Sequence, residues 1–444
     1  FSHVLLLLIV GLAGLTFAVG LWRGQPMLDM FMAAVALAVG AIPEGLPAAV
    51  TIILAIGVSR MAKRRAIVRR LPAVETLGST TVVCSDKTGT LTENQMTVRE
   101  ILAGGALWSV EGTGYAPEGR VIAEHSPPHT ETALEELFRC GVLCNDSTLL
   151  SEGGHWRTEG DPTEGALLTS GLKGGFDRVE TTAAFPRLDE IPFESQYQYM
   201  ATLHEAAGPS PPLVYIKGSL EALLPRCTAR LAPDGREVPL DFEATNTTAE
   251  TMAAKGLRVL ALARTTIEPG RTTVEHADLE SGLTFLGLQA MIDPARPAAI
   301  AAIRDCQSAG IRVKMITGDH VRTAAAIAGA IGLRPPPDSG LEEPEALSGS
   351  DLLGLGEREF REAAHRASVF ARVTPEQKLR LVQAMQAEGD VVAMTGDGVN
   401  DAPALKQANI GIAMGAEGTD VAREASDMVL TDDNFETIAA AVEE

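Results

Sequence analysis

Basic residues are in short supply in this sequence of 444 residues. Lysine and arginine together number 37 against 58 aspartates and glutamates, which leaves a formal net charge of −21. A protein that binds nucleic acid through bulk charge needs the opposite balance, so nucleic acid is not expected as a partner. Cysteine is also scarce, with an odd number of five, and a chain of this length needs no disulfides for stability. We therefore expect a reducing cytosolic environment.

The few cysteines do not suggest a metal site either. Cys140 and Cys144 could share one face of a helix, but no third and fourth ligand lies nearby. We interpret them as part of a buried helical face. Hydrophobic residues make up 45% of the chain, which is typical of globular proteins. At about 100–200 residues per domain, the length predicts two to four domains, and we expect the chain to be a piece of a longer protein.

Two apolar runs stand at the start of the chain. The run from His3 to Trp22 has no formal charge and about the 20 residues that cross a bilayer. It lacks the basic segment and the small-residue cleavage site of a signal peptide. A second run, Met30 to Val58, is followed by SRMAKRRAIVRR, whose positive charge places that end in the cytoplasm. The sequence predicts a hairpin of two transmembrane helices over residues 1–58 and a basic cytoplasmic stalk over 59–77.

The second apolar run is interrupted by the sequence AIPEGLPAAV. Pro43 and Pro47 each remove a backbone donor, so the helix should break there and free carbonyl groups at mid-membrane. Glu44 lies in the break, where a carboxylate costs about 2.5–3.5 kcal/mol on insertion scales. A carboxylate and free carbonyls suit a hard cation, although a proline kink with a paired glutamate is the alternative. No cysteine flanks Pro43, which disfavours copper or zinc. The groups that could converge on one transported cation belong to Val39, Gly40, Ile42 and Glu44.

Polar motifs follow four strand-like runs in the rest of the chain. Asp86 comes after the run Thr81–Cys84. The other runs lead to Thr317-Gly318-Asp319, to Arg372 and then Lys378, and to TGDGVNDAPAL with Asp397, Asn400 and Asp401. Helical segments alternate with these runs, and Thr374 and Gln377 form the pattern of a capping box before one of them. Strand–helix alternation predicts a parallel, doubly wound, Rossmann-like sheet with the polar groups at its carboxyl edge.

These residue types suit phosphoryl transfer. A carboxylate such as Asp86 can attack the γ-phosphate of ATP and form an acyl phosphate. The transferring group needs hydroxyl and amide donors, which Thr317 and Gly318 can supply, and a cation such as Lys378. Asp86 and Asp397 can hold Mg²⁺ through oxygen atoms. Each motif alone could be a glycine turn after a strand, but their order with a lysine between them favours phosphoryl transfer.

The motifs DKTGTLT, TGD and TGDGVNDAP, with PEGLP in the apolar run, resemble those of the P-type cation-transporting ATPases, calcium-type subgroup, in the haloacid dehalogenase-like superfamily. The resemblance implies an ATP-hydrolysing pump. Its predicted phosphorylation site comprises Asp86 as the phosphorylated residue, Lys87 and Thr88 beside it, Thr317, Gly318, Asp319 and Lys378 around the phosphate, and Asn400 and Asp401 as orienting groups. Asp397 and the Thr88 carbonyl would join Asp86 around Mg²⁺. Thr88 stands where phosphatase relatives have a second aspartate that hydrolyses the acyl phosphate, so the phosphoenzyme should persist.

A long insertion over residues 97–291 resembles the α+β nucleotide-binding domain of the same family. The motifs GDPTEGAL, IPFES, KGSLE and GLRVLALA contribute Asp161, Glu164, Phe193, Lys217 and Arg258. An aromatic face suits adenine, and cations suit the triphosphate. A helix cap, a core phenylalanine and a solvated lysine are the alternatives. The predicted nucleotide set is completed by Asp293, Arg296 and Arg372.

No TGE tripeptide occurs in the chain, and in the resembled family that motif lies in an actuator domain. The phosphorylation domain is expected over 78–96 and 292–431, and residues 432–444 resemble the start of the stalk to the next membrane helix. The resemblance therefore implies an actuator domain and further membrane helices as partners, in a bacterial plasma membrane with the catalytic part in the cytoplasm. Ca²⁺ is the expected transported cation. Mn²⁺ or Na⁺, or a membrane-anchored phosphatase of the haloacid dehalogenase type, are the alternatives.

Overall fold

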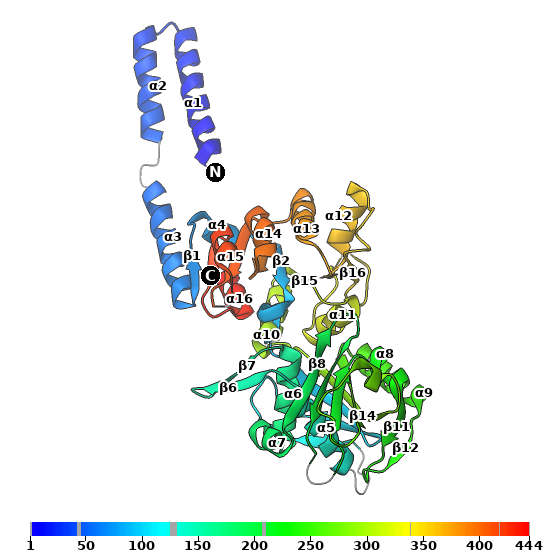
Figure 1. Ribbon diagram of the computed structural model, residues 1–444. Helices are drawn as coiled ribbons and strands as arrows, with labels where there is room; N and C mark the ends of the chain where they lie inside the picture. Colours follow the sequence, from blue (N-terminus) through cyan, green and yellow to red (C-terminus); the bar gives the residue numbers. More distant parts are fainter. Residues whose placement is uncertain are drawn as a thin grey trace.

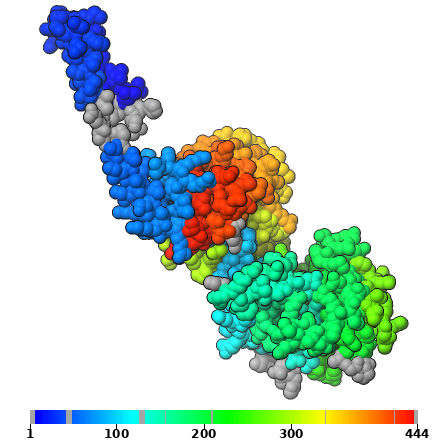
Figure 2. Space-filling model, turned by 60° about the vertical axis from the view of Figure 1, so that its left-hand side comes forward, coloured from blue at the N-terminus to red at the C-terminus, as the bar shows by residue number. Residues whose placement is uncertain are grey.

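The computed structural model describes residues 2–41, 46–124, 131–206, 210–337, 339–416 and 418–443. The chain forms an N-terminal helical hairpin, a domain built on a parallel sheet, and a second domain inserted into the first (Figure 1). We call the last two the parallel-sheet domain and the inserted domain. The hairpin projects away from the globular part of the molecule (Figure 2).

The hairpin consists of α1 (Ser2–Trp22) and α2 (Met27–Ala41), and α3 (Leu46–Lys63) leads from it to the parallel-sheet domain (Figure 1). These helices expose apolar side chains: Leu7 and Leu28 are each 72% exposed and Ile53 is 67% exposed. Within the described ranges, no helix combines the length and the apolar character that a membrane crossing requires. The transmembrane hairpin therefore stays a prediction.

The parallel-sheet domain has eight strands in the order β1-β20-β19-β18-β2-β15-β17-β16. All neighbouring pairs are parallel except β1 with β20 at one edge, so the predicted parallel sheet is confirmed. The four runs that precede the polar motifs form β18, β2, β15 and β17, which are adjacent in the sheet. The strands are β1 (Ala66–Val68), β2 (Val82–Asp86), β15 (Arg312–Thr317), β16 (Ala346–Ser348), β17 (Val369–Ala371), β18 (Val392–Gly396), β19 (Ile410–Met414) and β20 (Met428–Leu430).

Helices cover both faces of this sheet. Successive residues of β2 alternate between two apolar cores, because Val83 packs into one core while Val82 and Cys84 pack into the other. Thr374 and Gln377 form the predicted capping box at the start of α13. The helices are α4 (Pro72–Leu77), α10 (Pro297–Ser308), α11 (Val321–Ala330), α12 (Glu357–Arg366), α13 (Pro375–Ala387), α14 (Ala402–Gln407), α15 (Asp420–Ala425) and α16 (Phe435–Glu443). Phe435 of α16 is fully buried in the same core as Val83.

The inserted domain enters and leaves through two neighbouring strands. Thr97 of β3 pairs with Ile292 of β14, so both connections lie next to each other at the border with the parallel-sheet domain. Its main sheet runs β5-β4-β3-β14-β13-β10-β9-β8, with β11 and β12 attached and β6 and β7 as a separate hairpin. The strands of the main path are β3 (Thr97–Ala103), β4 (Ala106–Val110), β5 (Val121–Ala123), β8 (Arg187–Glu194), β9 (Tyr199–His204), β10 (Leu213–Gly218), β13 (Arg258–Thr266) and β14 (Leu283–Ile292).

Helices complete the α+β architecture of the inserted domain. They are α5 (Glu131–Leu143), α6 (Pro162–Lys173), α7 (Arg178–Ala184), α8 (Leu220–Leu223) and α9 (Phe242–Ala254), and the remaining strands are β6 (Thr148–Glu152), β7 (His155–Glu159), β11 (Cys227–Leu231) and β12 (Glu237–Pro239). Cys140 and Cys144 are fully buried and contact backbone carbonyl groups, which confirms their interpretation as a buried helical face.

Candidate active site

Asp86 is the last residue of β2, and a turn follows it directly. Its Oδ1 accepts a hydrogen bond from the backbone N–H of Lys87 at 2.7 Å. Its own backbone N–H donates to Oγ1 of Thr395 on the neighbouring strand β18 at 3.2 Å. Gly89 in the turn has a φ of 71°, a left-handed conformation that glycine adopts without a steric penalty. The adjacent strand and the turn together fix the position of Asp86 at the carboxyl edge of the sheet.

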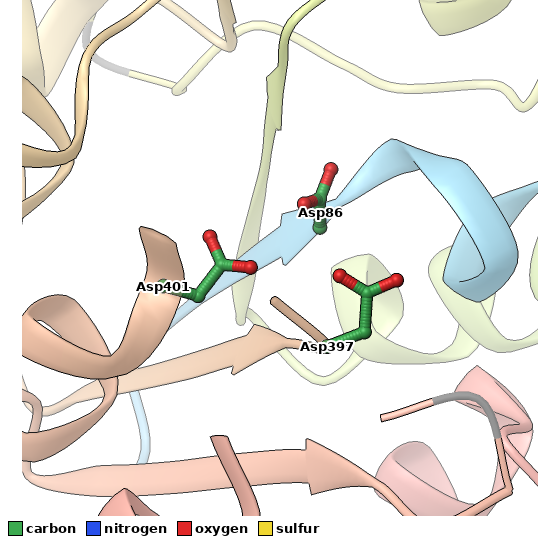
Figure 3. A group of neighbouring side chains, drawn as sticks. All are labelled: Asp86, Asp397 and Asp401. Atoms are coloured by element: carbon green, nitrogen blue, oxygen red, sulfur yellow. The ribbon is translucent and has the colours of Figure 1, made fainter. Parts of the chain in front are cut away.

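Three carboxylates meet at this edge (Figure 3). Asp86, Asp397 and Asp401 each offer an oxygen atom within 4.8 Å of the others. Asp397 follows β18 directly, and Asp401 ends the short 3-10 helix η4 (Val399–Asp401). The ammonium group of Lys378 on α13 donates to Oδ1 of Asp401 at 2.6 Å and lies 3.4 Å from Oδ2 of Asp86. Two motifs that lie about 300 positions apart in the sequence thus form one polar cluster.

The charges of this cluster are not balanced. Burial raises the pKa of Asp86, with Lys378 opposing the rise and Asp401 adding to it. Burial, followed by the charges of Asp86 and Asp401, raises the pKa of Asp397 to about 6. Burial alone would lower the pKa of Lys378, but the two neighbouring carboxylates outweigh it and the pKa is raised. Three carboxylates face one ammonium group, so a divalent cation with oxygen ligands fits this site.

Lys87, the residue after Asp86, forms ion pairs with two other carboxylates. Its Nζ lies 3.3 Å from Oδ2 of Asp293 and 3.0 Å from Oδ2 of Asp319, and the residue is only 4% exposed. Asp293 also accepts hydrogen bonds from Oγ1 of Thr92 at 2.5 Å and from the backbone N–H of Gln95 at 3.2 Å. The structure therefore brings the DKTG motif, the TGD motif and Asp293 together around one buried ammonium group.

A cavity of about 330 Å³ lies between the two domains beside this ion-pair cluster. Its lining includes Lys87, Gly318, Asp319 and Arg372 from the parallel-sheet domain and Arg258 from the inserted domain. Arg372 has a φ of 50°, which is uncommon for a residue with a side chain. The cavity is thus lined by cationic side chains from both domains, together with the carboxylates of Asp293 and Asp319, next to the carboxyl edge of the sheet.

The structure also places four further predicted residues. Arg296 donates through Nε to the Thr92 carbonyl at 2.8 Å and lines a separate cavity of about 490 Å³. Asn400 is exposed in η4, and its side chain makes no hydrogen bond within the described part of the chain. Thr317 is buried, and its Oγ1 accepts a hydrogen bond from the backbone N–H of Asp319 at 3.1 Å. Thr88 is half-buried in the turn after Asp86.

Among the predicted nucleotide residues of the inserted domain, Lys217, Glu164 and Asp161 lie at or beside the start of α6, whereas Phe193 lies on β8. Lys217 of β10 is 7% exposed and forms an ion pair with Glu164 of α6. Asp161 caps α6, because its Oδ1 accepts hydrogen bonds from the backbone N–H groups of Thr163 at 2.7 Å and Glu164 at 3.3 Å. The helix-cap alternative is therefore confirmed for Asp161. Phe193 of β8 is 61% exposed, so it is not a core residue.

The predicted ligands of a transported cation are only partly within the described residues. Val39 and Gly40 are exposed near the end of α2. Ile42 and Glu44 lie outside the described residues.

Sequence reasoning missed two threonines that support the site. Thr92 holds Asp293, and Thr395 accepts a hydrogen bond from the backbone of Asp86. Both lie inside or next to the recognised motifs, so a hydroxyl residue beside a motif carboxylate is the signal that could have identified them.

Comparison with known families agrees with this geometry. Residues 229–409 and residues 378–442 each match a family described as haloacid dehalogenase-like hydrolase. Residues 133–298 match the cytoplasmic domain N of P-type ATPases. The first two matches define the class of the parallel-sheet domain, and the third covers most of the inserted domain.

Similar proteins extend over the whole chain. It is 57% identical to the cation-transporting ATPase pma1 of Synechocystis sp., 52% identical to the probable cation-transporting ATPase F of Mycobacterium tuberculosis and 44% identical to the calcium-transporting ATPase of Bacillus subtilis. Each alignment covers 100% of the chain and 49% of the relative, so the chain spans about half the length of the curated relatives it matches. The chain belongs to the P-type ATPase family, whose members use ATP and Mg²⁺.

Proposed function

We propose that this chain carries the phosphorylation and ATP-binding steps of a cation pump, and that Asp86 receives the γ-phosphate of ATP. The observation that carries the proposal is the position of Asp86, at the carboxyl edge of the sheet with Asp397, Asp401 and Lys378 around it. Aspartyl phosphorylation needs a carboxylate that is held in place, here at the end of a strand. It also needs a lysine beside that carboxylate and an acidic cluster whose charge is not balanced.

In the proposed step, an oxygen of the Asp86 carboxylate bonds to the γ-phosphorus while the bond to the bridging oxygen of ADP breaks. Lys378 compensates the charge that collects on the transferring oxygens, and Thr317 and Gly318 supply hydroxyl and amide donors. Mg²⁺, when bound, would supply further positive charge to stabilise the transferring group. Asp86, Asp397 and the Thr88 carbonyl are the proposed holders of this ion, while Asp401 keeps its hydrogen bond to Lys378.

The cavity between the domains is the proposed path of the triphosphate. Arg258, Arg372 and Lys87 line it, which gives it cations from both domains. We assign Phe193 to the adenine because its ring is exposed on β8. Lys217 and Glu164 belong to the same proposed nucleotide site, and Asp161 supports it as the cap of α6. Asp293 and Arg296 hold the connection between the two domains and complete the proposed set.

A phosphatase with a membrane anchor is the second candidate, and Thr88 disfavours it. A threonine cannot replace the aspartate that phosphatase relatives use as the acid and base of hydrolysis, so the phosphoenzyme should persist. Persistence suits a pump that changes shape before dephosphorylation, with Asn400 and Asp401 orienting the site.

We further propose that residues 1–58 span the membrane and that the pump carries Ca²⁺. The exposed apolar side chains of α1, α2 and α3 support the first part, because apolar side chains in contact with lipid are not a cost. For the second part, the calcium-transporting ATPase of Bacillus subtilis is 44% identical to this chain, and PEGLP offers irregular oxygen ligands. The remaining proposed divisions are a stalk over 59–77, the phosphorylation domain over 78–96 and 292–431, and the nucleotide domain over 97–291.

The test is Asp86→Asn in the whole pump. We expect it to abolish incorporation of radiolabelled phosphate from ATP and to leave ATP binding largely in place, because an amide keeps the shape but is not a nucleophile. Asp305→Asn on the exposed side of α10 is the control, and it should keep full labelling. Acid-stable labelling that is undiminished in Asp86→Asn would refute the assignment.

A further inference from the structure

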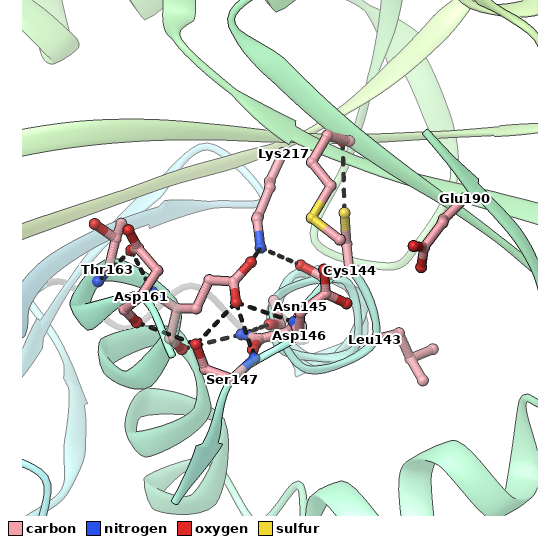
Figure 4. A network of polar contacts seen from close by, with 12 residues as sticks. Leu143, Cys144, Asn145, Asp146, Ser147, Asp161, Thr163, Glu190 and Lys217 are labelled. Carbon is pink, nitrogen blue, oxygen red and sulfur yellow. Dashed lines mark hydrogen bonds and ion pairs between the residues drawn. The ribbon is translucent and has the colours of Figure 1, made fainter. Parts of the chain in front are cut away.

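The turn Asn145–Ser147, which follows α5, lies beside the ion pair of Lys217 and Glu164 (Figure 4). Oε2 of Glu164 accepts three hydrogen bonds from this turn: from the backbone N–H of Asp146 at 3.0 Å, from the backbone N–H of Ser147 at 2.9 Å and from Oγ of Ser147 at 2.9 Å. Oε1 of Glu164 pairs with Lys217. Both carboxylate oxygens are therefore engaged inside the protein, which leaves Glu164 poorly placed to bind a ligand directly.

Arg187 holds the same turn from the other side. Its Nη2 donates to the carbonyl groups of Leu143 at 3.0 Å and Asn145 at 2.8 Å, and its Nη1 donates to Oδ1 of Asp146 at 2.7 Å. The planar fork of a guanidinium group presents its donors in a fixed geometry, so it holds these acceptors in one arrangement. The turn is thus fixed between Arg187 and Glu164.

Lys217 is the group that this arrangement places. Its ammonium group has three donors, and two of them point to Glu164 and to the carbonyl of Cys144, the latter at 2.6 Å. The third donor has no partner within the described residues, and the side chain that carries it is 7% exposed and cannot swing freely. Burial works to raise the pKa of Glu164, but Lys217 together with the hydrogen bonds from Asp146 and Ser147 outweighs it and the pKa is lowered, so Glu164 stays ionised.

We propose that Ser147, Glu164 and Arg187 are positioning residues of the nucleotide site, and that they act on ATP only through Lys217. This inference rests on the proposed function and refines it, because it moves Glu164 from the ligand shell to the support of Lys217. Ser147 and Arg187 are new members of the site. The alternative is that the turn stabilises the inserted domain in general and has no specific link to ATP.

The experiment measures ATP affinity of the whole pump in two backgrounds, wild type and Lys217→Ala. Ser147→Ala removes one donor to Glu164 and should weaken ATP binding about two- to tenfold in the wild-type background, the range expected for one hydrogen bond. In the Lys217→Ala background the same change should have no further effect, because residues that act through one group are not additive. Phosphorylation by inorganic phosphate, which needs no nucleotide, should be unchanged in both.

Arg187→Gln, a substitution near the surface, is the second test variant and takes the place of Ser147→Ala if that variant does not fold. It should likewise weaken ATP binding in the wild-type background and have no further effect in the Lys217→Ala background. Glu190→Gln is the matched control, because it breaks only the exposed ion pair of Arg187 with Glu190 and should leave ATP affinity unchanged. Equal weakening in both backgrounds, or no weakening in the wild-type background, would overturn the proposal. If Lys217→Ala itself leaves ATP affinity unchanged, both this proposal and the nucleotide assignment of Lys217 fail, whereas the Asp86 assignment is judged by its own labelling test.

Discussion

Binding of Mg²⁺ to the acidic cluster should release protons, and Asp397 sets the pH at which this happens. Its pKa is raised from 3.8 to about 6, mainly by burial and then by Asp86 and Asp401. The group is therefore about nine-tenths ionised at pH 7 and only about one-tenth ionised at pH 5. A metal ion must displace that proton, so the apparent dissociation constant for Mg²⁺ should rise about tenfold between pH 7 and pH 5. An aspartate with the ordinary pKa would change the constant by less than about one-tenth over this range.

Calorimetric titration of the nucleotide-free pump with MgCl₂ tests this prediction. At pH 6, runs in two buffers with different ionisation enthalpies should reveal release of at least about half a proton from Asp397 for each ion bound. Asp397→Asn should weaken Mg²⁺ binding at pH 7 and reduce the proton release at pH 6, with any remainder arising from Asp86. Equal proton release in the wild type and in Asp397→Asn, or an affinity that stays constant from pH 7 to pH 5, would contradict the assignment of Asp397 as a ligand.

Three further predictions concern other parts of the chain. Phe193→Ala and Lys217→Ala should each weaken ATP affinity without changing labelling by inorganic phosphate; unchanged affinity in both would show that the nucleotide site is elsewhere. Glu44→Gln should abolish Ca²⁺-activated phosphorylation from ATP and spare phosphorylation from inorganic phosphate, and activation at the original Ca²⁺ concentration would refute the ion assignment. His204 is buried and its pKa is lowered from 6.5 to about 4, mainly by burial, so its contribution to stability is full above about pH 6.5 and declines as the pH falls towards 4. Urea unfolding should show a loss of about 2 kcal/mol at pH 5 that is absent in His204→Gln.

The parallel sheet and its polar edge could be predicted because both depend on local patterns. Short β-branched runs such as Thr81–Cys84 become buried strands, and the Thr374 capping box marks a helix start whatever surrounds it. Parallel strands have their carboxyl ends at one edge, so the meeting of Asp86 with Asp397 follows from topology alone.

The partners of individual side chains could not be predicted in the same way. Lys87 was expected beside the phosphorylated residue, but its ion pairs with Asp293 and Asp319 depend on how three distant segments pack. The role of Ser147 had no signal in the sequence beyond an ordinary Asn-Asp-Ser turn, because its importance comes from the position of Glu164 on another helix. Periodicity predicts which face is buried, and it contains no information about which of several acids a buried cation will select.

The route of the chain through its two domains explains why the buried cluster around Lys87 lies where it does. The chain enters the inserted domain at β3 and leaves it at β14, and Asp293, the residue after β14, binds Thr92 and Gln95 on the segment that leads into β3. The same carboxylate pairs with Lys87, which directly follows Asp86. A movement of the inserted domain must therefore pass through a hydrogen-bonded connection that begins one residue from the proposed nucleophile. Because the cluster is buried, breaking its ion pairs and hydrogen bonds costs much free energy. This favours a connection that rotates as a rigid unit over one that bends freely. The residues that join the two domains thus form a continuous set of contacts from the inserted domain to the proposed phosphate-accepting edge.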